Sequence, residues 1–237
     1  MTSTSATFAV GDTYIDSSGP DTRFADITPM TLARSGGPMP IEQRILLEFD
    51  TEIGREKVID ATLRLYQAAQ TDSDVEIRIS RVTTDFDALD ATWNAPWANP
   101  GGDIDLSDEA SVTLTPAAAG QRTIVDLASL IQPQINNGDG MVRLMIRVIG
   151  SGSMLIHATE DPDEDRRPRL IVRSTPTGST DIVSSNIGTP SQLNADVDAP
   201  SDIAAASRTP EGVDSSIKPA TDPARVEVKT PERGDIV

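Results

Sequence analysis

The strongest constraint on the fold is an alternation of apolar and charged residues with a period of two, which recurs along residues 1–173. In QRILLEF (43–49), Ile45 and Leu47 alternate with Arg44 and Glu48. Successive side chains of a strand point to opposite faces, so the pattern predicts a strand with one buried and one solvated face. The same alternation recurs in ATLRLY (61–66), DVEIRISRV (74–82), MVRLMIRVI (141–149) and PRLIVR (168–173).

The segments between these predicted strands are rich in Gly, Pro, Asn and Asp, which is typical of turns. Many short antiparallel strands, each with one face to bury, favour two packed sheets. We therefore expect an all-β fold over residues 1–173, a jelly-roll-like sandwich of two antiparallel sheets.

One segment, VDLASLIQPQINNGDG (125–140), departs from the strand pattern. Leu127, Leu130 and Ile131 recur there at the spacing of one helical face. We expect a single short helix, capped by Asp126, limited by Pro133 and ended by the glycines that follow.

The composition changes near Ser174. Residues 174–237 contain no aromatic residue but hold seven of the 17 prolines, together with many Ser and Thr. Such a segment cannot bury enough apolar surface to offset the entropy of ordering it. We expect an extended or disordered C-terminal arm, which is either a simple linker or a strap that lies along another surface.

Charge and cysteine content narrow the classes of function. The net charge is −17 and cysteine is absent. An acidic chain repels phosphate backbones, so we expect no nucleic-acid partner. Disulfides and thiolate metal sites require cysteine. No apolar stretch has the length of a membrane span or a signal peptide, so we expect no membrane partner and no export through a cleaved signal.

No arrangement of residues in the sequence indicates catalysis. His157 is the single histidine, and neither a nucleophile elbow nor a phosphate-binding loop occurs. Asp103, Asp105 and Asp108 in GDIDLSDEA (102–110) are candidate metal ligands, but their spacing lacks the glycine and closing glutamate of an EF-hand loop. We therefore expect a protein that is not an enzyme and needs no cofactor, with a solvated acidic loop here.

Five motifs stand in an order that resembles a known family. They are DTYIDSS (12–18), RILLEFDTEIGREKVIDATLRLY (44–66), VEIRISRVTTDFDALDATWNAPW (75–97), TIVDLASLIQPQINNGDG (123–140) and HATEDPDEDRRPRLIV (157–172). Together they resemble the DNRLRE-type β-sandwich module, which is related to carbohydrate-binding module family 96 and is found in bacterial surface proteins and phage structural proteins. The resemblance spans about residues 7–173 and leaves the arm unmatched.

The segment ATWNAPW (91–97) holds both tryptophans of the chain. The resemblance implies that a recurrent signature of the family lies here, usually with one Trp. We expect Trp93 to plug the end of the sandwich and Pro96 to fix the next bend. Trp97 is then the better candidate for exposure, and with Tyr66 and Tyr14 it is a candidate sugar-stacking residue.

The segment EDRRPRLIV (164–172) resembles the closing strand of the family. We expect Glu160 to form a charge-paired turn with Arg166 and Arg167. Surface ion pairs contribute only about 0–1 kcal/mol each, so this turn would set the register of the strand more than its stability.

Two functions follow from these observations. The first is a structural protein of a phage virion, a capsid decoration or tail-associated component assembled in the host cytoplasm, which attaches to other virion subunits through residues 174–237. The alternative is a carbohydrate-binding module that recognises a surface polysaccharide. The scarcity of aromatic residues favours the first reading, and a glycan could be a further partner of such a protein.

Overall fold

The computed structural model describes residues 2–177, so nearly all of the predicted arm lies outside the described residues. Within them the chain forms ten strands, one α-helix and one 3-10 turn. Their bounds are β1 Ser3–Asp16, β2 Met30–Arg34, β3 Glu42–Asp50, β4 Lys57–Gln67, β5 Val75–Val82, β6 Ile104–Leu114, β7 Gly120–Ile124, α1 Ala128–Asn137, β8 Met141–Ile149, β9 Gly152–Ile156, η1 Glu164–Arg166 and β10 Arg169–Thr175.

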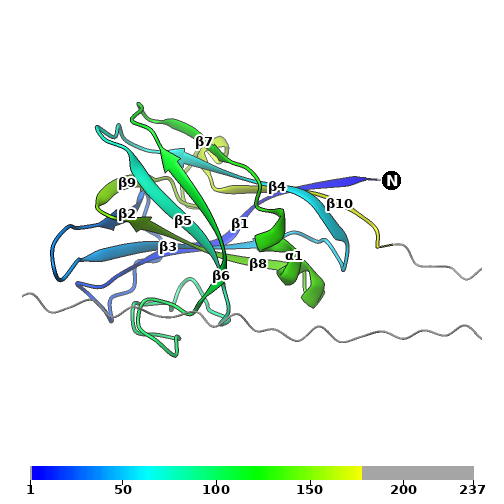
Figure 1. Ribbon diagram of the computed structural model, residues 1–237, viewed down its shortest axis with the longest axis horizontal. Helices are drawn as coiled ribbons and strands as arrows, with labels where there is room; N and C mark the ends of the chain where they lie inside the picture. Colours follow the sequence, from blue (N-terminus) through cyan, green and yellow to red (C-terminus); the bar gives the residue numbers. More distant parts are fainter. Residues whose placement is uncertain (1, 178–237) are drawn as a thin grey trace, which may run out of the picture. The chain divides into compact units, whose positions relative to one another are not determined.

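The strands form two layers, and in Figure 1 β4, β7 and β10 of one layer lie above β3 and β8 of the other. The first layer holds β7, β4, β10 and the first half of β1, and the second holds the rest of β1, β3, β8, β5 and β6. Strand β1 joins the layers because it changes partner: Phe8 is opposite Arg169 of β10, whereas Ala9 is opposite Phe49 of β3. A register shift between Ala9 and Gly11 accompanies the change, as is common where a strand bends.

A second connection closes the other side of the sandwich. Strand β2 pairs with both β3 and β9, and Ile156 at the end of β9 lies opposite Gln67 of β4. The sheet therefore returns on itself in a barrel-like arrangement with extra strands. The predicted all-β fold of two antiparallel sheets with one short helix is confirmed.

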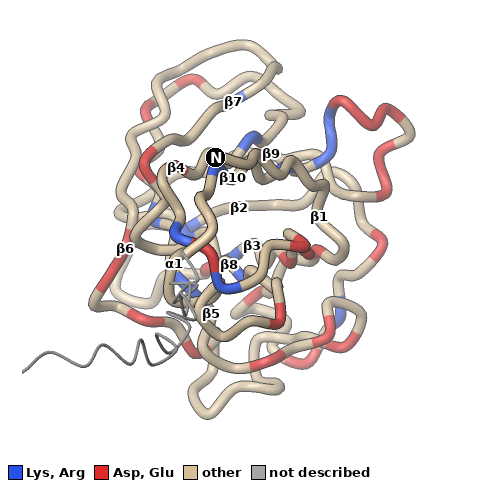
Figure 2. Tube along the Cα trace, turned by 90° about the vertical axis from the view of Figure 1, so that its right-hand side faces the viewer, with Lys and Arg blue, Asp and Glu red and all other residues tan. Residues whose placement is uncertain are grey.

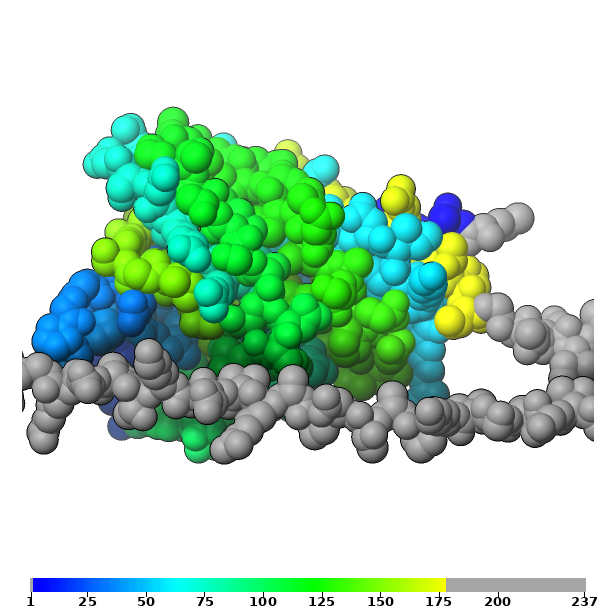
Figure 3. Space-filling view, viewed as in Figure 1, coloured from blue at the N-terminus to red at the C-terminus, as the bar shows by residue number. Residues whose placement is uncertain are grey.

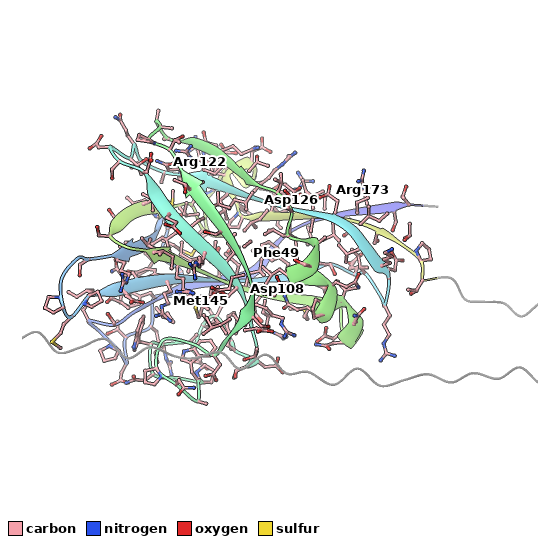
Figure 4. All side chains as sticks on the ribbon, viewed as in Figure 1. Phe49, Asp108, Arg122, Asp126, Met145 and Arg173 are labelled. Atoms are coloured by element: carbon pink, nitrogen blue, oxygen red, sulfur yellow. The ribbon has the colours of Figure 1, made fainter. Side chains whose placement is uncertain are left out.

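The main core lies between the layers, where the inward-facing side chains of both sheets meet. Phe49, labelled in Figure 4, is fully buried there with Leu63, Ile77, Leu144 and Val172 from four other strands. These are the apolar members of the alternating segments, so the period of two assigned the buried face of each strand correctly. Burial of such side chains is the main source of stability in a fold of this kind.

Helix α1 packs against β4 and β8 and adds three buried side chains, Leu130, Ile131 and Ile135, to the core. In Figure 3 it lies beside the other green segments that cover the middle of this face. The expected capping was wrong: Leu127 occupies the N-cap position without a side-chain hydrogen bond, and Pro133 lies inside the helix. Gly138 ends the helix in the left-handed conformation, as the sequence predicted.

A second apolar cluster covers the outer face of the second layer. We call it the outer cluster; its members are Ile15, Leu46, Val82, Phe86, Ala88, Ala91, Trp97 and Met145. The loop of residues 83–103, seen below β8 in Figure 1, contributes its buried side chains to this cluster. Because this layer is covered on both faces, β3 buries the consecutive residues Ile45, Leu46 and Leu47 rather than every second one.

The two tryptophans take the opposite places to those expected. Trp97 is only 7% exposed, and its Nε1 donates a hydrogen bond of 2.7 Å to the carbonyl oxygen of Thr92. Trp93 is half-buried, with the Arg44 guanidinium 4.7 Å from its ring centroid. The expectation that Trp97 is the more exposed was wrong because the outer cluster needs a large apolar side chain from this loop, and Trp97 supplies it.

Candidate functional site

The three predicted sugar-stacking residues lie in three different environments. Trp97 belongs to the outer cluster, and Tyr14 is 8% exposed with its ring stacked on Phe24 at a centroid distance of 4.3 Å. Neither ring therefore offers a free face. Tyr66 is half-buried on the outer side of the first layer, where Arg166 lies 5.6 Å from its ring centroid and the His157 ring meets it edge-on at 5.5 Å.

The charge-paired turn before β10 exists, but with different partners from those expected. Arg166 pairs with Asp163 at 3.1 Å, and Arg167 lies 3.8 Å from Glu164. Glu160 is exposed and accepts a hydrogen bond from Thr159 instead. The expected pairing was wrong because η1 places an acid three residues before each arginine, which brings the two charges together within one turn.

The other single residues from the sequence have local structural partners. Pro96 lies exposed in the loop of residues 83–103, after a cis peptide bond. His157 Nδ1 contacts the Asp161 carboxylate.

The acidic segment is divided among separate contacts. Asp103 accepts hydrogen bonds from the backbone of Ala98 and Asn99, Asp105 pairs with Arg81 at 2.6 Å, and Asp108 faces Ser129. Across residues 2–177, no three acidic or histidine side chains converge in a manner that could hold a metal ion. The three candidates therefore do not share one site.

The structure contains a compact pocket that the sequence did not indicate. It lies on the outer face of the first layer and has a volume of about 250 Å³. Its lining combines three cationic side chains, one acid, two aromatic rings, one amide and one leucine: Phe8, Arg64, Leu65, Tyr66, Gln121, Asp165, Arg167 and Arg169. We call it the arginine pocket. In a chain with net charge −17, this concentration of positive charge is unusual.

Strand register places two of these arginines side by side. Arg169 of β10 is directly opposite Arg64 of β4, and Phe8 of β1 is opposite Arg169 on its other side. Directly opposite side chains lie about 4.5–5.5 Å apart at Cβ, and like charges there are destabilising. Among residues 2–177, neither Arg64 nor Arg169 forms an ion pair, and the Arg169 Nε is buried without a hydrogen-bond partner.

The same chain shows how such a pair is normally compensated. Arg78 of β5 is directly opposite Arg147 of β8, and Glu109 of β6 lies between them, 3.2 Å from Arg78 and 2.7 Å from Arg147. The Arg147 Nε also lacks a partner, but its terminal nitrogen is paired. Although burial opposes ionisation of Glu109, hydrogen bonds from Arg147 and Ser80 keep its pKa below the usual value. In the arginine pocket, by contrast, Asp165 lines the wall but forms no ion pair with Arg64 or Arg169.

Two larger cavities suit a charged or stacked ligand less well than the arginine pocket does. One of about 610 Å³ is lined by polar loop residues without an aromatic ring, and its Arg34 already pairs with Glu42 and donates to the Gly150 carbonyl oxygen. Another, of about 460 Å³, is rimmed by Asp85, Asp87 and Asp90, while its Phe86 is buried. Figure 2 shows that acidic residues also occur in many other segments of the described chain.

Another cavity, of about 220 Å³, is lined by five carboxylates and no cation: Asp12, Asp26, Glu48, Asp87 and Glu160. We call it the acidic cavity. Burial raises the pKa of Asp12 to about 7, and the charge of Glu160 adds to this, while hydrogen bonds from Thr159 oppose it. Glu48 has a raised pKa too, mainly through burial, although Arg143 counteracts it. Because these two carboxyl groups have raised pKa values in the folded chain, the free energy of unfolding should depend on pH.

Sequence reasoning missed the arginine pocket because its members are far apart in the chain. Arg64 and Arg169 are neighbours only through the pairing of β4 with β10. One signal was present: both segments that carry them, ATLRLY and PRLIVR, place arginine on the solvated face. That signal does not say that the two strands are adjacent, nor that the arginines share a register position.

No helix in the described part of the chain is long and apolar enough to cross a membrane. The chain matches carbohydrate-binding module family 96 over residues 3–174, and it therefore belongs to that family. Among curated proteins no match was found. Membership places the chain in a class of binding modules and favours the alternative reading, carbohydrate binding. Nothing in the fold or the family supports the virion role, and the DNRLRE assignment also stays a prediction.

Proposed function

We propose that the chain binds a polysaccharide that carries anionic groups, and that the arginine pocket is the binding site. The observation that carries this proposal is the directly opposed pair Arg64 and Arg169, which forms no ion pair with any carboxylate of residues 2–177, Asp165 included. A carboxylate or sulfate of a sugar would occupy the place that Glu109 takes between Arg78 and Arg147. Guanidinium groups recognise such planar or tetrahedral anions through paired hydrogen bonds.

The other residues of the pocket supply what a sugar needs beyond its charge. The side chains of Gln121 and Asp165 can exchange hydrogen bonds with hydroxyl groups, and Tyr66 adds a phenolic hydroxyl and part of a ring. Pockets for small ligands commonly combine such a few convergent polar groups with apolar walls. Phe8, whose ring lies 5.2 Å from the Arg169 guanidinium, provides the apolar wall here.

The overall negative charge of the chain limits which anions bind. A net charge of −17 repels any polyanion at long range, so attraction is confined to the pocket. At physiological ionic strength the repulsion is screened beyond about 8 Å, whereas contacts inside the pocket are screened far less. Binding should therefore depend on fit at Arg64 and Arg169 rather than on general attraction.

The test compares three soluble polymers by isothermal titration calorimetry at physiological salt: polygalacturonate, dextran sulfate and neutral dextran. The proposal predicts binding to at least one of the anionic polymers and none to dextran; the first two distinguish carboxylate from sulfate. The variant R64Q/R169Q should lose at least tenfold in affinity, because a charge-assisted hydrogen bond contributes about 1.5–3 kcal/mol and about 1.4 kcal/mol is tenfold.

The matched control is Arg173→Gln. Arg173, labelled in Figure 4, lies on β10, four residues from Arg169 and on the same face of the strand, and it is exposed. It removes one charge without touching the pocket, so affinity should change less than twofold. Equal losses in both variants would show general electrostatic attraction, and unchanged binding by R64Q/R169Q would show that the glycan binds elsewhere.

A further inference from the structure

The shape of the arginine pocket, taken with the proposed function on which this step rests, indicates which part of a glycan it holds. We infer that the pocket receives the end of an anionic polysaccharide, one terminal sugar residue, and does not bind internal stretches of the chain. The inference stands on the volume of the pocket, on its walls and on the state of its aromatic rings.

The volume of the pocket limits the number of sugar residues that it can hold. At about 250 Å³ the pocket is smaller than the pockets of about 300–1,000 Å³ that bury drug-sized molecules. A site for an internal stretch must hold several consecutive sugar residues and remain open at two ends. This pocket has room for one sugar ring and part of the next.

The walls of the pocket limit how far a sugar chain can extend along the strands. Along the strands, the pocket continues from Arg64 past Tyr66 and then meets Asp165 and Arg167 of the connection between β9 and β10. Across the strands, Phe8 of β1 bounds one flank and Gln121 of β7 the other. A sugar chain lying along β4 would therefore run into the connection before β10 and could not pass beyond it.

The wall at the end of the pocket is held firmly. The Arg167 Nε donates a hydrogen bond of 2.9 Å to the carbonyl oxygen of Asp161, and its backbone N–H donates to Glu164. Asp163 accepts a hydrogen bond from the backbone of Asp165 and so caps η1. Pro168, which follows, is buried. These contacts oppose a displacement of the connection that would open the pocket into a groove.

The aromatic rings of the pocket are not free to stack on several consecutive sugar rings. Modules that bind long stretches of polysaccharide by stacking need a row of exposed ring faces. Here the guanidinium of Arg166 lies over the Tyr66 ring and that of Arg169 lies over the Phe8 ring. Both rings are thus partly covered by cations and form the sides of a pocket, and they do not form an open platform.

The test measures stoichiometry and affinity against chain length. Oligogalacturonates of two to eight residues and the polymer are titrated into the full chain by calorimetry, in parallel with a matched series of sulfated maltooligosaccharides. The expected result is one protein molecule per sugar chain at every length, with affinities per chain that agree within about threefold. At equal mass, long polymer should bind less protein than short oligomers because it has fewer ends.

The opposite results are distinct. Several protein molecules per chain, or an affinity that rises more than tenfold between two and eight residues, would overturn chain-end binding. If that binding were still lost in R64Q/R169Q and kept in Arg173→Gln, the proposed function would stand and this inference alone would fail. Polymer binding without any oligomer binding would equally overturn it, and absence of binding in both series would remove the proposed function as well.

Discussion

Arg64 and Arg169 lie directly opposite each other on two neighbouring antiparallel strands, and no carboxylate within residues 2–177 pairs with either. The fold thus holds two like charges next to each other, and no ion pair among residues 2–177 compensates their repulsion. The other opposed pair, Arg78 and Arg147, encloses Glu109. This difference distinguishes the proposed binding site from a structural network of ion pairs, and it leads to the first prediction.

Removing one arginine from each pair should have opposite effects on stability. Arg64→Gln should leave the free energy of unfolding unchanged or raise it by about 0.2–1 kcal/mol, because it relieves repulsion across the sheet. Arg147→Gln should lower it by about 1–3 kcal/mol, because it deprives Glu109 of a charged partner. Urea denaturation of the two variants checks this. A loss of more than 1 kcal/mol in Arg64→Gln would mean that the pocket arginines have a structural role.

The tryptophan-bearing loop should matter for stability and not for binding. Trp97→Ala removes a buried side chain of the outer cluster and its hydrogen bond to Thr92, and should cost about 3–5 kcal/mol. Trp93→Ala removes a half-buried ring and should cost less than half as much. Denaturation curves measure both losses, and calorimetry with the anionic glycan should show unchanged affinity for Trp93→Ala. A tenfold loss of affinity there would place the glycan on the loop.

Close packing of the loop of residues 83–103 against the sheet should make Gly102 hard to replace. A Cβ at Gly102 would overlap the terminal methyl group of Met145, which is fully buried in the outer cluster and has little room to move, and the φ of +98° already disfavours other residues. Gly37 has a similar φ of +107° but nothing near its Cβ position, so Gly37→Ala measures the cost of the positive φ without a steric clash. Gly102→Ala should lower the melting temperature more than Gly37→Ala does. Equal decreases would mean that the loop yields easily to the added methyl group.

The acidic cavity should make stability depend on pH through Asp12. Its pKa is raised from 3.8 to about 7 in the folded chain, so between these values the folded state keeps a proton that the unfolded state has lost. This contribution to stability is fully present below about pH 4 and is lost as the pH rises through 7.

Asp12→Asn removes the titrating group and keeps one oxygen, which can accept the hydrogen bond from the Thr159 backbone, while its amide nitrogen can donate to the Thr159 hydroxyl. At pH 8 the variant should be more stable than the natural chain by about 1–3 kcal/mol, and near pH 4 the two should differ little. Thermal unfolding of both proteins from pH 4 to 8 provides the measurement. A variant that is less stable at pH 8 would show that the ionised carboxylate stabilises the fold.

The sequence was sufficient for the fold class and for most of the buried face of each strand. Ile45 and Leu47 in β3, and Leu144 and Ile146 in β8, all lie in the main core as the alternation predicts. The outer cluster was missed, although Leu46 and Met145 interrupt the alternation at the two places where it lies. Three consecutive apolar residues in a strand indicate that both faces are buried, and this signal was available.

The candidate site was less accessible from sequence, for a physical reason. Period two says which face a side chain takes, but it does not specify which strands pair or in which register. Arg64 and Arg169 are 105 positions apart in the sequence, and their contact follows from the pairing of β4 with β10. Tyr66, one of the three candidate stacking residues, is half-buried and lines the arginine pocket, whereas Trp97 and Tyr14 are buried because the two clusters use them for packing.

The most direct test of the central claim is nuclear magnetic resonance of the arginine Nε–H groups during titration with a single sugar. Monomeric galacturonate and its neutral counterpart galactose are added in turn, with galactose 6-sulfate as the sulfated arm. The arginine pocket predicts that the Arg64 and Arg169 signals shift with one of the anionic sugars and stay in place with galactose. Equal shifts with galactose, or shifts confined to residues near Trp93 or Phe86, would contradict it.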